Sequence, residues 1–76
     1  MAIHLCEVII RETRQSVKFY EIEIENRPMV GFTDWDAMFD ARRKAVAMFK
    51  KEMKHTPNLR KLIGDRDWCV DSIIIS

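Results

Sequence analysis

The sequence predicts a single α+β domain over residues 1–76, in which an antiparallel sheet of three to four strands carries one long helix on one face. Two observations lead to this prediction. The stretch 33–56 contains neither Gly nor Pro and has apolar residues at helical spacing. The segments on both sides of it are rich in β-branched and aliphatic residues, as strands are. The expected order is strand, strand, a short additional strand, helix, strand.

The first two strands are predicted to form a hairpin. Residues 3–12 are rich in β-branched and aliphatic residues and lead into the polar turn 13–16, after which residues 17–25 form a second strand whose apolar and acidic side chains alternate from Tyr20 onward. In that second strand one face is apolar and the other is acidic: Tyr20, Ile22 and Ile24 against Glu21, Glu23 and Glu25.

The pairing register of this hairpin decides which side chains the helix covers. Cys6, Val8 and Ile10 are expected beside the apolar face of the second strand, because the opposite register would bury Glu7. An unpaired buried carboxylate costs several kcal/mol, on the order of the known penalties for buried charge. The outer face of the sheet would then mix acidic and apolar residues: Glu7, Glu21, Glu23, Glu25, Leu5, Ile9, Val17 and Phe19.

After the hairpin, the sequence predicts a short connection and then the long helix. Residues 26–28 read as a turn and residues 29–32 as a short edge strand, in which Gly31 permits a bend. Thr33 can cap the first turn of the helix and Pro57 cannot continue it. The predicted buried face is Ala37, Ala41, Ala45, Met48 or Phe49, and Met53.

Two further elements complete the chain. Residues 56–64 predict one or two helical turns, with Thr56 as cap, Pro57 at the first position and Gly64 as the stop. Residues 68–75 predict a final strand that needs a neighbour to pair with.

Size and charge restrict the classes of function. A domain of 76 residues buries only about 60% of its unfolded surface, so we expect its stability to be either marginal or supplemented by a partner, for which a homodimer would be one ordinary form. The 13 basic and 12 acidic residues argue against a generic basic nucleic-acid binder. Acidic residues dominate positions 1–40 and basic residues dominate positions 42–61, which predicts a molecule with one acidic and one basic face.

No segment approaches the roughly 20 apolar residues of a membrane span, and the two cysteines do not form a disulfide framework. A soluble cytoplasmic protein, in a bacterium or a virus-infected cell, is therefore expected. No catalytic grouping, phosphate loop or cofactor motif is present, so we expect neither an enzyme nor a cofactor. A zinc site is not expected either, because the available ligands lack the usual paired spacing: His4, Cys6, His55 and Cys69.

Two surfaces are candidates for function. The outer sheet face combines apolar anchors with steering charges, which predicts binding to a basic protein partner through Glu7, Phe19, Glu21, Glu23 and Glu25. The alternative is nucleic-acid binding by the basic flank of the helix, through Arg42, Arg43, Lys50, Lys51 and Lys54. A third alternative is a homodimeric structural protein whose dimer seam is the outer sheet face.

The layout of the chain resembles small phage-encoded inhibitor proteins, the anti-CRISPR and antitoxin-like group. The hairpin VIIRETRQSVKFYEIEIE, the helix DAMFDARRKAVAMFKKEM and the closing strand WCVDSIII carry this resemblance. It implies an inhibitor that binds a host or cognate protein complex and presents an acidic surface where nucleic acid would otherwise bind. The layout is also similar to antitoxin domains with a partial ribonuclease-H-like fold and, more distantly, to three-stranded DNA-binding domains of integrases. No functional residue is carried over from these families.

Overall fold

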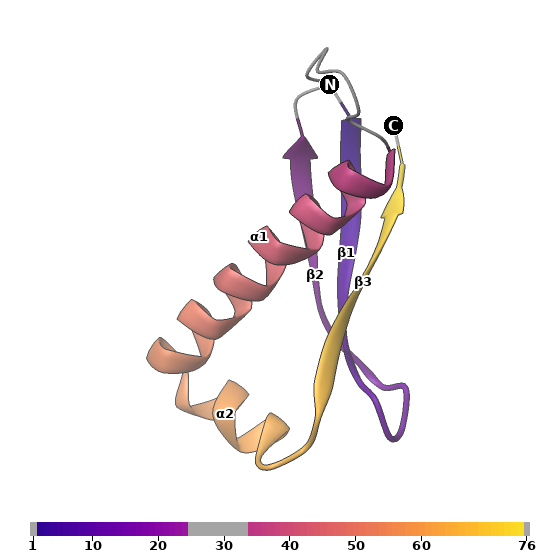
Figure 1. Ribbon diagram of the computed structural model, residues 1–76. Coiled ribbons are helices and arrows are strands. Elements are labelled where there is room, and N and C mark those ends of the chain that lie inside the picture. The colour runs from indigo at the N-terminus through magenta and orange to yellow at the C-terminus, as the bar shows by residue number, and fades with distance from the viewer. Residues whose placement is uncertain (1, 25–33, 76) are drawn as a thin grey trace.

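The computed structural model, which describes residues 2–24 and 34–75, places one long helix across a three-stranded antiparallel sheet (Figure 1). The elements in chain order are β1 (Ala2–Ile10), β2 (Ser16–Ile24), α1 (Asp34–His55), α2 (Pro57–Ile63) and β3 (Trp68–Ile74). This confirms the α+β prediction. The cap at Thr33, the turn at 26–28 and the short strand expected at 29–32 lie outside the described residues.

The sheet has the order β2-β1-β3, with both pairs antiparallel. The final strand therefore finds its neighbour in β1, whose other side already pairs with β2. On the outer face of this central strand Ile3 and Leu5 are partly buried and Ile9 is buried. The strand order also brings the two chain ends to the same end of the sheet (Figure 1).

The register of the hairpin agrees with the prediction over most of its length. Cys6 lies opposite Tyr20 and Leu5 opposite Glu21, so the two apolar faces meet on the helix side. Between Val8 and Ile9 the register shifts by a β-bulge. The extra residue in β2 interrupts the alternation, and Val17 packs against the core. The predicted position of Val17 on the outer face is therefore wrong.

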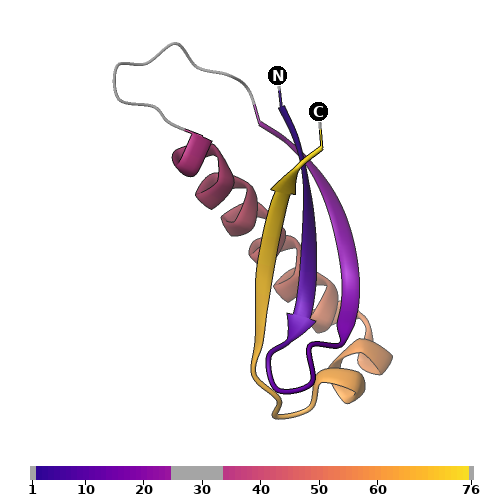
Figure 2. The same cartoon turned by 90° about the vertical axis from the view of Figure 1, so that its right-hand side faces the viewer.

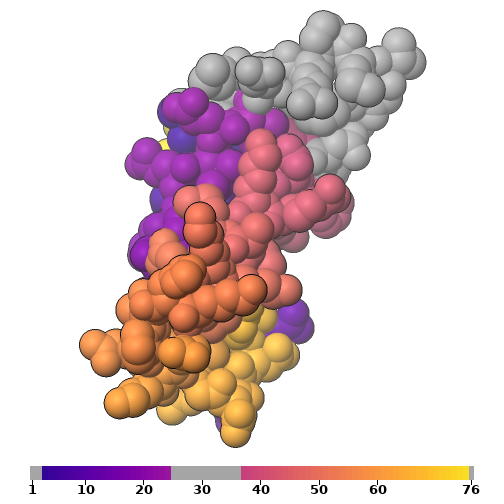
Figure 3. Space-filling model, turned by 90° about the vertical axis from the view of Figure 1, so that its left-hand side faces the viewer, coloured from indigo at the N-terminus to yellow at the C-terminus, as the bar shows by residue number. Residues whose placement is uncertain are grey.

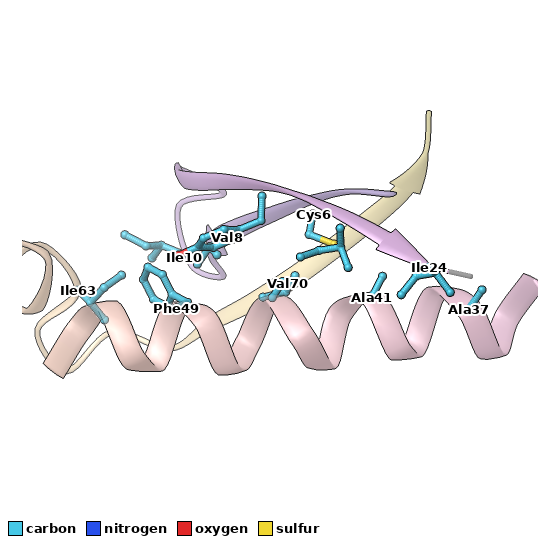
Figure 4. Packing of buried hydrophobic residues seen from close by; sticks show 12 residues of the cluster. Cys6, Val8, Ile10, Ile24, Ala37, Ala41, Phe49, Ile63 and Val70 are labelled. Carbon is cyan, nitrogen blue, oxygen red and sulfur yellow. The ribbon is translucent and has the colours of Figure 1, made fainter. Parts of the chain in front are cut away.

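One face of α1 packs on the sheet through small residues and one large one. Ala37, Ala41 and Ala45 are buried, and their lack of bulk lets the helix lie close to the strands (Figure 4). Phe49 is fully buried and its ring meets Trp68 edge to face, with 4.9 Å between ring centroids. The sequence left the choice between Met48 and Phe49 open, and Phe49 occupies the core position whereas Met48 is exposed. Met53 is partly buried against the same core, as predicted.

The short helix α2 closes the end of the core. It begins with Pro57 after Thr56 and ends at Gly64, whose φ of 57° favours glycine, as the sequence indicates. Thr56 occupies the cap position, but its side chain makes no capping hydrogen bond. Ile63 is the buried anchor of α2 and joins the cluster around Phe49.

Candidate interaction surfaces

The face of the sheet that points away from α1 is open. Figure 2 views this side directly: the three strands lie in front and α1 runs behind them. The core cluster is built from the opposite faces of the strands together with the helices. Within residues 2–24 and 34–75, no helix or second sheet packs on the outer face. Phe19 and Ile73 are well exposed on this face, whereas Ile9 of the central strand is only 3% exposed.

Apolar side chains occupy much of this open face. Leu5 of β1 lies between Glu21 of β2 and Ile73 of β3 in one cross-strand row. Ile73 is 61% exposed, and Phe19, in the next row, is 53% exposed. Large apolar side chains gathered on one exposed face are typical of interaction sites.

Acidic side chains border these apolar residues. Glu21 and Glu23 of β2 are exposed, and neither forms an ion pair with any described residue. Glu7 sits at the centre of the sheet, between Phe19 and Asp71. The open face thus carries several negative charges within a few residue spacings of its apolar side chains.

Two acidic residues of this face, Glu7 and Asp71, have partners within the molecule. The Glu7 carboxylate accepts a hydrogen bond from the Ser16 hydroxyl, with 2.7 Å between the oxygens. Asp71 lies 3.6 Å from the guanidinium of Arg14, in a pair exposed enough to contribute about 0–1 kcal/mol. Glu21 and Glu23 therefore have more freedom to meet an external cation than Glu7 and Asp71 have.

The structure brings together four of the residues predicted for partner binding: Glu7, Phe19, Glu21 and Glu23. Glu25 lies outside the described residues. Sequence reasoning missed Asp71 and Ile73, which stand beside Glu7 and Leu5. The alternation in the last strand places Asp71 and Ile73 on one face, but only the pairing of β3 with β1 shows which face that is. We define the acidic sheet surface as Leu5, Glu7, Phe19, Glu21, Glu23, Asp71 and Ile73.

The helices carry the second candidate surface. Arg43, Lys50, Lys51 and Lys54 are exposed on α1, and none of them has an ion-pair partner among the described residues. Figure 3 shows α1 and α2, coloured pink to orange, spread over this side of the molecule. Two exposed basic residues of α2, Arg60 and Lys61, extend the positive charge. Together with Pro57 they line a shallow hollow. These six basic residues form the basic helical surface, so the expected division into an acidic and a basic face is present.

Arg42 does not belong to this surface, contrary to the prediction. It is partly buried, its Nη2 lies 3.9 Å from the Sδ of Met38, and its guanidinium stands 5.9 Å from the ring centroid of Phe39. Burial raises the pKa of the Cys6 thiol, and the charge of Arg42 opposes that rise. The physical reason is helical geometry: Arg42 follows the buried Ala41 and so projects beside the sheet rather than away from it.

A third set of charged residues connects the sheet with the long helix. Lys18 of β2 forms a salt bridge with Glu52 of α1. The hydrogen bond from Lys18 lowers the pKa of Glu52. Tyr20 lies close by, and burial together with the Glu52 carboxylate raises the pKa of Tyr20. The Tyr20 hydroxyl makes no hydrogen bond of ordinary geometry with any described residue. These residues tie β2 to the helix and leave both candidate surfaces free.

The four residues considered as zinc ligands are spread over three places. His4 and Cys6 lie on the helix side of β1, Cys69 lies on the other face of the sheet, and His55 is the last residue of α1. Within the described chain, no three His, Cys, Asp or Glu residues are arranged to hold a metal ion.

Neither described helix is both long enough and apolar enough to cross a membrane. No protein-family model, no curated protein and no solved structure matches this chain. Its function is therefore inferred from the chemistry of its two surfaces.

Proposed function

We propose that this protein is a non-catalytic inhibitor or regulator that binds a basic protein surface with its acidic sheet surface. One observation carries the proposal. Phe19 and Ile73, 53% and 61% exposed, stand on an open sheet face together with the carboxylates of Glu21 and Glu23, which form no ion pair with a described residue. Large apolar side chains that share one exposed face with acidic residues favour an interaction site over a surface that is only solvated.

The two kinds of residue contribute differently to binding. Burying Phe19 and Ile73 against a partner removes apolar surface from water, which supplies affinity. Glu21 and Glu23 attract a basic partner and orient it as it approaches, which supplies association rate and specificity. An acidic sheet that occupies a basic site competes with phosphate for that site. Inhibition by occlusion follows, as in the phage-encoded inhibitors of host defence or toxin complexes that the chain resembles in layout.

A charge-reversal experiment tests the proposal. The tagged protein captures a defined protein from host lysate, and the double variant Glu21→Lys, Glu23→Lys fails to capture it. The matched control reverses two exposed acids that lie in turns, away from the acidic sheet surface: Glu12→Lys with Asp65→Lys. Circular dichroism checks that both variants fold. Capture that survives the first pair, or that both pairs abolish equally, contradicts the assignment of this surface.

Nucleic-acid binding by the basic helical surface is the second candidate. It is favoured by the exposure of Arg43, Lys50 and Lys54, which have no ion pair with a described residue. A duplex or single strand would then bind with an affinity that falls as salt rises, because each phosphate contact releases counterions. Gel-shift titrations between about 0.05 and 0.2 M salt test this, over the range in which phosphate contacts weaken by orders of magnitude. No retardation at the lower salt concentration rules it out.

A further inference from the structure

The two edges of the sheet differ in charge. In the described sheet β2 and β3 are the edge strands, and β2 carries exposed Glu21 and Glu23. The end of β3, from Ser72 onward, has no charged residue. Its last three isoleucines are exposed by 61%, 52% and 48%: Ile73, Ile74 and Ile75. Natural edge strands are usually protected from pairing by charge, proline or a bulge, and the end of β3 has none of these.

Among the described strands, β3 pairs only with β1, so one side of its backbone has no strand partner there. Ile75 N–H donates to the Ile3 carbonyl (2.9 Å) and Arg11 N–H donates to the Asp67 carbonyl (3.0 Å). In an antiparallel ladder the residues that bond to one neighbour alternate with those that face the other side. Because Asp67 and Ile75 both bond toward β1, every second residue between them does the same. The amides of the residues in between face away from β1: Val70, Ser72 and Ile74.

A side chain at the same edge also lacks a partner. The Ser72 hydroxyl is buried on the helix side of β3, and Ser72 as a whole is 7% exposed. It makes no hydrogen bond with any residue that the structure describes. A buried hydroxyl without a partner destabilises the fold, so a group that formed a hydrogen bond with it would be stabilising.

The helix layer leaves room for another strand. In Figure 2 the first turns of α1 appear beyond the β3 edge, behind the sheet, and the helix then crosses diagonally toward β2. A strand added to β3 would therefore have α1 beneath part of it. If a second molecule is related to the first by a two-fold axis, the start of its α1 lies near the beginning of the first molecule's β3. There the first molecule's own α1 has already crossed toward β2.

We propose that β3 pairs antiparallel with β3 of a second copy, about a two-fold axis at Ser72, so that the two three-stranded sheets become one of six strands. The two Ser72 hydroxyls then lie opposite each other and hydrogen-bond across the seam. Asp71 lies beside the second copy's Ile73. A register centred on Asp71 would instead set two carboxylates face to face, which is unfavourable.

This pairing does not rest on the proposed function, because it uses the backbone edge of the sheet. It leaves Phe19, Glu21 and Glu23 of the acidic sheet surface open and sets Asp71 and Ile73 of that surface beside the second copy. It places the two acidic sheet surfaces side by side on one continuous face. It also adds buried surface to a small domain of 76 residues.

Amide hydrogen exchange of the unmodified protein tests the pairing directly. The amides of Val70, Ser72 and Ile74 should exchange about tenfold or more slowly at millimolar than at micromolar concentration, since pairing must open before they exchange. The outward amides of the β2 edge serve as the internal control and should not change: Phe19, Glu21 and Glu23. Equal exchange at both concentrations overturns the proposal. So does protection confined to other residues, as stacking of two outer sheet faces would give.

Sedimentation equilibrium gives the second readout. The protein should approach twice its chain mass of 9.0 kDa at high concentration. Ile74→Lys should remain at the mass of one chain, because it places charge at the seam. Leu62→Lys on α2 is the matched control, since Leu62 is 43% exposed against 52% for Ile74, and it should still dimerise. A monomeric unmodified protein, or a dimer that survives Ile74→Lys, contradicts the edge pairing.

Discussion

His4 is a polar side chain that the core buries completely. It is 0% exposed, it lies between Ile22 and Ile74, and neither of its ring nitrogens has a hydrogen-bond partner among the described residues. An unsatisfied buried polar group costs about 1–3 kcal/mol. The sequence offers no sign of this, because a histidine near a strand end is ordinarily exposed.

Replacing His4 by leucine should therefore stabilise the protein. The free energy of unfolding of His4→Leu is expected to rise by about 1 kcal/mol, because the unsatisfied nitrogens disappear while the volume is roughly kept. Urea denaturation at pH 7 measures the change. His55→Leu, at an exposed position, is the control and should stay within about 0.5 kcal/mol of the unmodified protein. A destabilised His4→Leu would show that the imidazole contributes more than it costs.

At the scale of the element, the spacing between α1 and the sheet depends on its small residues. Ala45 is fully buried against the strands, whereas Ala47, two residues on, is exposed on the same helix. Ala45→Leu should lower the free energy of unfolding by about 1–3 kcal/mol, because the larger side chain forces the helix away from the sheet. Ala47→Leu should leave it nearly unchanged, and chemical denaturation compares the two. Equal effects would mean that α1 does not pack closely at Ala45.

The salt bridge between β2 and α1 makes stability depend on pH. The pKa of Glu52 is lowered from its ordinary value of 4.5, chiefly by the hydrogen bond from Lys18. A lowered pKa in the folded state contributes stability above the ordinary value, and this contribution is lost as the pH falls through the lowered one. Both side chains are partly exposed, so the contribution is small, about 0.5 kcal/mol.

Glu52→Gln should accordingly be less stable than the unmodified protein at pH 7, by about that 0.5 kcal/mol, and the difference should shrink toward pH 3. Denaturation curves at the two pH values provide the measurement. A difference that is constant with pH would show that Glu52 acts through packing and not through its charge.

At the scale of the whole molecule, the net charge of +1 conceals two faces of opposite sign. At low ionic strength the protein should bind both an anion and a cation exchanger, and about 0.15 M salt should release it from both, since the screening length is then about 8 Å. The charge reversals at Glu21 and Glu23 should abolish retention on the anion exchanger. The control pair at Glu12 and Asp65 gives the same net charge and should keep it. Equal loss in both variants would mean that net charge, and not the acidic sheet surface, governs retention.

The sequence by itself determined the elements whose signals are local. The helix α1, the turns of α2 up to Gly64 and the alternation of β2 all appear where capping residues, Pro and Gly, and apolar periodicity indicate. The hairpin register also followed, because burying Glu7 would have been too costly. These features need only neighbouring residues, or a single charge, to specify them.

The tertiary structure alone decided which segments meet. The pairing of β3 with β1 is a long-range contact, and it brought Asp71 and Ile73 to the acidic sheet surface and made β3 an edge strand of the described sheet. The bulge that turned Val17 inward has the same origin. No local pattern encodes these contacts, because each depends on how strands and helix fill a shared core.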